Sequence, residues 1–334
     1  MTYSLSLLDK SPLLEGETAV AALQRTTSLV QAAERLGYRR FWLAEHHDFP
    51  GLASPAPEVL AAYLLARTQR IRIGTGGVLL PHYSPYKVAE IFNLLSSLAP
   101  GRVDLGIGKA PGGLPFSTKA LRVLHDPARA PTFEVLLDEL DAFLAPPSAT
   151  PGSQERARAL PVPPSLPERF LLGASPDSGR QAGERGWHFV FAGHHNGDPK
   201  AIEESLEAYT KSGGSSAPLL AVAAFAAPTT EEALSLTENH RVVRLTLDNG
   251  QNLNLGSEEQ AAEYARQAGA ASYRTEIRTP HVLAGTPEQV RRELDALHAR
   301  FGIAEFIIET PGALTAKRLA SVTLLAGETP ALAA

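Results

Sequence analysis

Short apolar segments typical of β-strands alternate with amphipathic segments typical of helices along most of this 334-residue chain. This alternation favours a parallel sheet built from βα units, because consecutive parallel strands need a long crossover connection. We expect strands at residues 4–8, 40–44, 71–74, 103–107, 169–173, 188–192, 219–225 and 305–309. Eight parallel strands close a (β/α)8 TIM barrel, so the sequence predicts an α/β barrel of this class.

Amphipathic segments between these strands predict the barrel helices. We expect them to begin near Thr18 and near residue 131, and to occupy residues 57–67, 87–98, 176–185, 199–211 and about 287–301. The last of these has the clearest start: Thr286 is followed by Pro287 in the first turn and by Gln289 at the capping-box position.

Two segments depart from this alternation of strands and helices. Residues 146–168 are rich in Pro, Ser and Ala, and we interpret them as a surface loop because the βα pattern resumes directly afterwards. Residues 239–281 combine a polar, Asn- and Gly-rich stretch with a helix-like piece, which is typical of a mobile insertion near a barrel mouth. The length alone allows two domains, but the pattern favours a single domain over residues 1–334.

Composition excludes several classes of protein. The chain has 31 Lys and Arg against 36 Asp and Glu, so it lacks the basic surface that binds nucleic acid. Without cysteine it has no disulfide, thiolate nucleophile or zinc-thiolate site. The longest apolar run, residues 219–227, is far shorter than the roughly 20 residues that span a bilayer. The N-terminus has no export-signal pattern, so we expect a cytoplasmic protein without a membrane partner.

The second expected strand ends in three chemically capable residues, Glu45, His46 and His47. Active sites of (β/α)8 barrels lie where the strands end, which favours a functional interpretation. A packed or surface role is the alternative for a single histidine. A metal site is a weaker hypothesis, because adjacent residues on a strand point to opposite faces. Glu45 and His47 alone could share an ion, and no third ligand is evident.

Glycine-rich turns follow the third and fourth strands. Residues 74–77 are either an ordinary turn or a place where the backbone approaches a flat ligand. Residues 106–113 lack the spacing of the dinucleotide fingerprint, but a glycine-rich loop carrying Lys109 can bind an anion.

After the fifth strand, Ala174 and Ser175 open a helix that also presents Ser178, a pattern that suits a phosphate. Helix capping alone explains Ser175 well and Ser178 poorly. A glycosidase with paired carboxylates is conceivable on such a barrel, but no two acids at the strand ends require that interpretation. The elbow motif of a serine hydrolase is absent.

The runs FWLAEHH at residues 41–47 and RIRIGTGGVLLPHYSPYKVAEIFNLLSSLAPGRVDLGIGKAPGG at residues 70–113 resemble the bacterial luciferase-like flavin-dependent monooxygenases. They are most similar to the single-component group of that family. The resemblance returns at residues 171–195 and 284–290. It implies a (β/α)8 barrel that holds FMN at the carboxyl ends of its strands and uses reduced FMN with O₂.

The resemblance assigns roles at matching positions near the flavin ring. His46 matches the active-site histidine beside the reacting edge of the isoalloxazine. Gly76 and Gly77 match the pair joined by a non-prolyl cis peptide beneath the ring. His82, Tyr83 and His195 are further candidates for lining the site.

The FMN phosphate is expected between two other loops. Ser175 and Ser178 match the phosphate-binding hydroxyls of the family, and Ala174 precedes them. Lys109 stands where the family usually has an arginine. An ammonium cannot make the two parallel hydrogen bonds that a guanidinium donates to a phosphate. At residues 112–114 this chain has Gly-Gly-Leu where the group typically shows Gly-Ser-Asp.

Partners are also implied by the resemblance: a small organic substrate, O₂, a separate flavin reductase that supplies reduced FMN, and a second copy of the chain. The homodimer is expected to form through the helices after strands two and three. Three alternatives stay open: an oxidoreductase that transfers hydride with the deazaflavin F420, a flavin-binding protein without turnover, and a metal-dependent barrel hydrolase.

Overall fold

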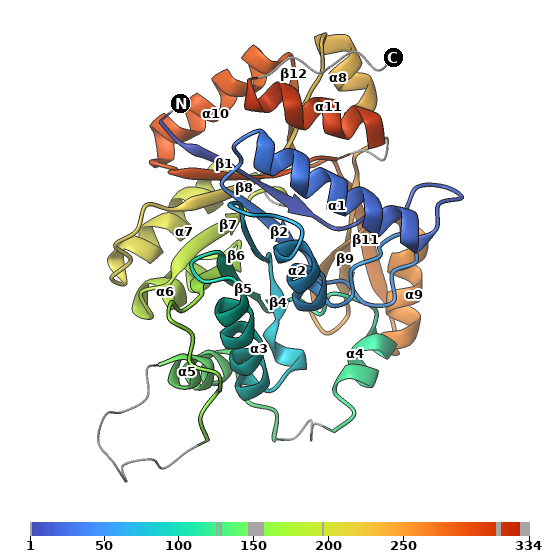
Figure 1. The fold of residues 1–334 in the computed structure, drawn as a ribbon. Coiled ribbons are helices and arrows are strands. Elements are labelled where there is room, and N and C mark those ends of the chain that lie inside the picture. Colours follow the sequence, from blue (N-terminus) through green and yellow to red (C-terminus); the bar gives the residue numbers. More distant parts are fainter. Residues whose placement is uncertain are drawn as a thin grey trace.

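Eight parallel strands form a closed barrel at the centre of the computed structural model (Figure 1). They are β1 (Ser4–Asp9), β2 (Arg40–Leu43), β3 (Arg72–Thr75), β5 (Val103–Gly108), β6 (Glu168–Gly173), β7 (His188–Ala192), β8 (Leu219–Ala226) and β13 (Glu305–Glu309). Pairing of β1 with β13 and of β7 with β8 closes the ring. The eight predicted strands and the barrel are confirmed.

The structure describes residues 2–124, 126, 129–145, 157–195, 197–311 and 315–327, without the side chains of residues 315 and 316. Two short strands that the sequence did not predict lie beside the ring. β4 (Val78–Leu79) pairs with β5, and β12 (Val282–Gly285) pairs with β8, both in parallel. In the described part of the chain, no helix is both long and apolar enough to cross a membrane.

The predicted helices surround the barrel (Figure 1). They are α1 (Ala19–Arg35), α2 (Pro57–Leu65), α3 (Pro85–Leu98), α5 (Phe133–Leu144), α6 (Pro176–Glu184), α7 (Pro199–Lys211) and α10 (Pro287–Phe301). The expected capping box is present at Thr286 and Gln289. Helices that were not predicted are α4 (Pro115–Leu121), α8 (Thr230–Thr237), α11 (Thr315–Ala326) and the 3₁₀ turn η1 (Leu80–His82).

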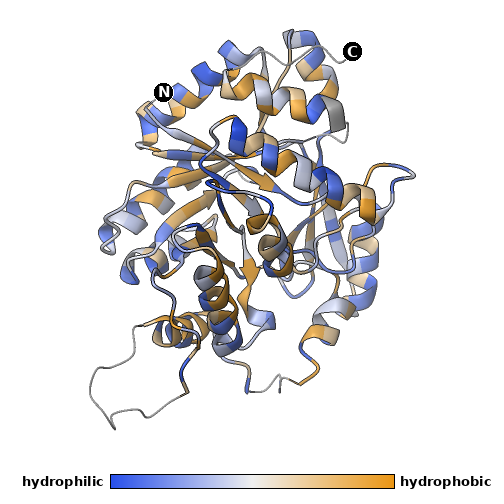
Figure 2. Cartoon of the chain, in the orientation of Figure 1, coloured by the Kyte–Doolittle hydropathy of each residue, from blue (hydrophilic) through white to orange (hydrophobic). Residues whose placement is uncertain are grey.

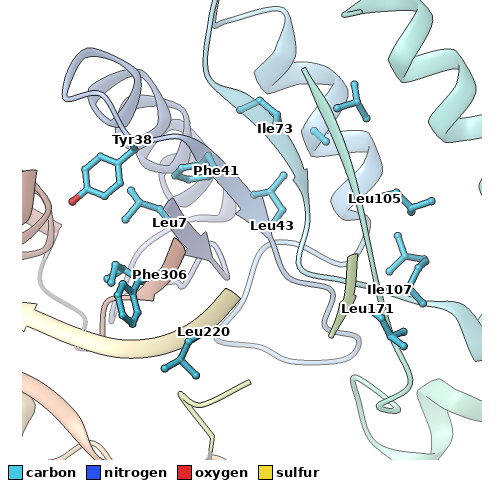
Figure 3. Packing of buried hydrophobic residues seen from close by; sticks show 14 of the residues in the cluster. Leu7, Tyr38, Phe41, Leu43, Ile73, Leu105, Ile107, Leu171, Leu220 and Phe306 are labelled. Atoms are coloured by element: carbon cyan, nitrogen blue, oxygen red, sulfur yellow. The ribbon is translucent and has the colours of Figure 1, made fainter. Parts of the chain in front are cut away.

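Alternating strand residues form two separate apolar layers, as the period of two in a strand requires. One layer fills the space between strands and helices, and Figure 3 shows strand residues such as Phe41, Leu105 and Phe306 in it. The other layer fills the barrel interior; it is made of Leu8, Trp42, Ala44, Phe170, Leu172, Val190, Leu219, Ala221 and Ile307. Figure 2 shows the contrast between hydrophobic strands and helices of mixed hydropathy.

The interruption at residues 239–281 is a small sheet with one helix rather than a polar segment and a helix alone. β9 (Val242–Leu247) pairs antiparallel with β10 (Asn252–Leu255) and β11 (Tyr273–Arg278), and α9 (Glu258–Ala268) covers it. The unit contacts α4, which follows the carboxyl end of β5, so it lies at that end of the barrel (Figure 1). Its mobility stays a prediction.

The proline-rich segment falls partly outside the described residues, which exclude positions 146–156. Residues 157–167 contain neither helix nor strand, and β6 begins at Glu168. A connection of this kind between α5 and β6 is compatible with the expected surface loop. The single domain over residues 1–334 likewise stays a prediction.

Candidate active site at the barrel mouth

Lys109 and the start of α6 meet at the rim formed by β5 and β6. Nζ of Lys109 lies 3.6 Å from Oδ2 of Asp177 in the first turn of α6, and both side chains are about half exposed. Ser175 caps this helix by accepting the N–H of Ser178, and the two serine hydroxyl oxygens lie 3.1 Å apart. The two loops predicted to share an anion therefore lie side by side, with Ala174 at the end of β6 leading into the cap.

Asp177 is a neighbour that the sequence did not single out. Its carboxylate accepts hydrogen bonds from Arg180 at 2.9 Å and Gln181 at 2.7 Å, and with Lys109 these contacts lower its pKa. An anion bound at this rim would compete with Asp177 for Lys109.

The third strand ends in a non-prolyl cis peptide between Gly76 and Gly77. Neither glycine has room for a side chain. A Cβ at Gly76 would lie 2.9 Å from a methyl carbon of Leu8, and one at Gly77 would lie 2.8 Å from the carbonyl oxygen of Gly106. The second contact is with backbone, which cannot move aside as a flexible side chain can. Only glycine fits this turn without displacing the neighbouring strand.

His46 points toward the barrel axis, two residues beyond Ala44 of the inner layer. Its ring lies 6.0 Å from that of Phe49, and its Nδ1 is buried without a hydrogen-bond partner among the described residues. Burial first and then the positive charge of Lys10 lower the pKa of His46 to about 3. The imidazole is therefore neutral near pH 7, with a buried nitrogen free to meet a ligand.

Glu45 and His47 face the opposite side of β2, outside the barrel. Oε1 of Glu45 accepts from Tyr83 Oη at 2.8 Å and lies 2.6 Å from His47 Nε2, and Oε2 accepts from the Leu79 N–H at 2.9 Å. These bonds tie β2 to β4. Within the part of the chain that the structure describes, no three His, Asp or Glu side chains are grouped to hold a metal ion.

His82 is buried on this outer side too. Its Nε2 lies 2.9 Å from the carbonyl oxygen of Pro111, and its Nδ1 accepts from Nε of Arg122 at 3.2 Å. The proton is therefore on Nε2, because a carbonyl accepts and an arginine N–H donates. Tyr83 and Arg122 line a cavity of about 850 Å³ between α3, α4 and α5. His82 and Tyr83 thus contact the two neighbours of His46: the ring of His82 lies 5.7 Å from that of His47, and Tyr83 donates to Glu45.

The sequence interpretation missed three residues at the mouth whose charges act on His46: Lys10 after β1, Glu309 at the end of β13, and His194 after β7. Lys10 and Glu309 form an ion pair, and His194 Nε2 lies 3.6 Å from Glu309 Oε2. The ring of His195 lies 3.9 Å from that of His194. Nδ1 of His194 is buried without a partner in the described part of the chain.

Burial and charge set the protonation of this group. Burial alone raises the pKa of Glu309, but Lys10 and then His194 lower it below its ordinary value. Burial lowers the pKa of His194 to about 4, against the opposing effect of Glu309. Near pH 7 the group thus contains one positive charge, one negative charge and neutral imidazoles.

Comparison with known proteins identifies the family. The sequence model of the luciferase-like monooxygenases matches residues 1–304. N-acetyl-S-alkylcysteine monooxygenase of Bacillus subtilis strain 168 is 42% identical over 311 residues, 92% of each protein. The structure of apo-MsnO8 matches with a TM-score of 0.76 and 32% identity over 97% of each chain.

A more distant structure shares the fold alone. It is an F420-dependent secondary alcohol dehydrogenase in complex with an F420-acetone adduct, with a TM-score of 0.67 and 14% identity over 98% of each chain. The family match and the 42% identical relative cover most of the chain, in agreement with the resemblance seen in its motifs. The chain belongs to the luciferase-like monooxygenase family.

Proposed function

We propose that this protein is an FMN-dependent monooxygenase that uses reduced FMN and O₂ to oxygenate a small organic substrate. One observation carries the proposal: the same mouth has an anion-suited rim at β5 and β6 and two unpartnered buried imidazole nitrogens, on His46 after β2 and on His194 after β7. Buried polar groups without partners are rare in folded proteins and mark places where a ligand completes the hydrogen bonding.

The residues present fit FMN. Lys109, Ser175 and Ser178 would hold the phosphate, because an ammonium, two hydroxyls and a helix N-terminus all favour a dianion. The flavin ring would lie near Gly76 and Gly77, where packing against Leu8 and the backbone of Gly106 leaves room for glycine alone. Lys109 would then exchange Asp177 for the phosphate.

When bound, reduced FMN would supply the electrons that activate O₂ for insertion of one oxygen atom into the substrate. His46 would hold or move a proton at its Nδ1, which suits an imidazole that is neutral near pH 7. The inner apolar layer closes the barrel beneath His46 and excludes water from that side.

The relative from Bacillus subtilis is named for N-acetyl-S-alkylcysteine, so small thioethers are the first substrates to test. A separate flavin reductase would supply reduced FMN. A homodimer is proposed through α2 and α3, which expose Val59, Tyr63, Leu94 and Leu98. Sedimentation of only a 35.6 kDa species would contradict the dimer.

The deazaflavin F420 is the competing cofactor, since one protein with this fold is named for it. The decisive experiment adds chemically reduced FMN or reduced F420 to the purified protein and records O₂ uptake and product with a thioether substrate. We expect oxygenated product with FMN and none with F420. Hydride transfer from F420 without O₂ uptake would overturn the proposal. Binding of FMN without any turnover would instead support a flavin-binding protein.

A further inference from the structure

Lys10 and Glu309 lie on the side of the mouth farthest from the rim proposed for the phosphate. In the closed ring, β1 and β13 are neighbours. β1 stands three strands from β5 and β13 stands three strands from β6, so the two pairs of strands lie opposite each other. The inner layer contains Leu8 and Ile307, so strand alternation directs Lys10 and Glu309 inward as well. A substrate held here and a flavin held by its phosphate at the opposite rim would approach each other over the barrel axis.

Lys10 has unused hydrogen-bonding capacity. An ammonium carries three donors, and the carboxylate of Glu309 is its partner among the described residues. The Lys10 side chain is 24% exposed and that of Glu309 is 13% exposed, so Lys10 is the more accessible member of the pair. The other oxygen of Glu309 faces His194. A ligand entering from the mouth would therefore meet the ammonium first.

The surroundings of Lys10 are too polar for a hydrocarbon substrate. His46 and His194 each present a buried Nδ1 without a partner, and a hydrocarbon would leave both unsatisfied. A carboxylate would instead accept from the free N–H groups of Lys10 and from an imidazole N–H. Charge-assisted bonds of this kind are about twice as strong as neutral ones.

We propose that Lys10 binds a carboxylate group of the substrate, which makes the substrate a small carboxylate-bearing molecule. This inference rests on the proposed function, because it assigns the part of the same site that faces the flavin. Glu309 acts as a positioning residue that holds the ammonium toward the mouth. The carboxylate would lie between Lys10 and His194, which leaves Nδ1 of His46 for the proton.

The test compares N-acetyl-S-benzylcysteine with its primary carboxamide, which keeps the shape and removes the charge. Calorimetric titration into FMN-loaded protein measures binding of each compound to wild type, Lys10→Met and Lys10→Arg. We expect the acid to bind about 10- to 100-fold more tightly than the amide, the range for a hydrogen bond to a charged group. Lys10→Met should remove that difference, and Lys10→Arg should restore part of it.

Two further variants control for folding. Lys10→Met/Glu309→Gln removes both charges, so it leaves no unpaired buried carboxylate. It should also lose the difference in affinity between the acid and the amide. Lys200→Met replaces a lysine on α7 that is 81% exposed and should bind like wild type. Equal affinity for acid and amide, an equal loss for both compounds in Lys10→Met, or no binding of the acid by FMN-loaded protein would overturn the inference. Failure of the protein to bind FMN at all would instead refute the proposed function.

Discussion

The two ends of the barrel differ in whether their buried polar side chains have hydrogen-bond partners. At the amino-terminal floor, Arg40 donates to Glu305 at 2.8 Å, to Asp104 at 3.1 Å and to Glu168 at 2.8 Å. In the described part of the chain, no side chain of this network has an unpartnered buried atom, whereas His46 and His194 at the mouth each have one. The apolar inner layer separates the two ends. We infer that the floor serves stability and the mouth serves ligands.

Removing Arg40 should have the largest effect. Arg40→Met removes the nearest cation from buried Glu305 and one of two from buried Asp104, which keeps Arg72. The loss should cost about 3 kcal/mol of unfolding free energy. Urea unfolding measures the change. The matched control is Arg39→Met, because Arg39 is 51% exposed and meets Glu305 only at 3.5 Å. If the two variants lost equal stability, the floor would not be the stabilising end.

Replacing His46 should lower the oxygenation rate without weakening FMN binding. In His46→Ala we expect oxygenation to fall by about 10²-fold, the range for loss of a general acid or base. Affinity for FMN should change little, since the phosphate contacts remain. O₂ uptake with reduced FMN and a fluorescence titration of FMN give the two readings. A variant that keeps wild-type turnover at saturating FMN but binds FMN far more weakly would reverse the assigned roles.

The buried neutral histidine at the mouth predicts a pH effect. The pKa of His194 is about 4 when folded and about 6.5 when unfolded, so between these values only the unfolded chain binds the proton. Stability must therefore fall as the pH falls below 6.5. Between pH 7.5 and pH 5, the unfolding free energy of the wild type should fall by about 1 to 2 kcal/mol more than that of His194→Phe.

Unfolding curves at both pH values test this effect of His194. His281→Phe is the matched control, because the side chain of His281 is 67% exposed and should add nothing to the difference. Parallel losses in wild type and His194→Phe would show that His194 is not held neutral by the fold.

Lys109→Met should have the smallest effect on the fold. The pair with Asp177 is about half exposed, and such pairs contribute no more than about 0.5 kcal/mol to stability. Affinity for FMN should nevertheless fall by about 10-fold, as expected for one charged contact to phosphate. Unchanged affinity would remove Lys109 from the phosphate site.

Strand alternation made the barrel predictable from the sequence, because each strand and its helix carry their own pattern. β4 was missed since two residues show no period. β12 begins directly after the predicted insertion at residues 239–281, and its four residues are too few to mark a strand. The small sheet was missed for a similar reason: β11 is exposed throughout, so no hydrophobic alternation marks it. α11 was not predicted because it follows the last strand, so no later strand marks the end of its βα unit.

The site was predictable only where residues cluster in the sequence. Glu45, His46 and His47 are adjacent, whereas Lys10 and Glu309 are separated by 299 positions and meet only because β1 pairs with β13. Strand alternation alone would have placed both inside the barrel, but not against each other. Glu45, His46 and His47 lie beyond Leu43, where β2 ends, so their directions follow from their contacts and not from the strand period.

Anaerobic calorimetric titration of reduced FMN into the purified protein is the most direct test of a flavin site at the mouth. We predict saturable binding of one FMN per chain, weakened in Ser178→Ala and in Lys109→Met. An absence of binding heat across a range of temperatures, with no change in flavin fluorescence, would contradict the account.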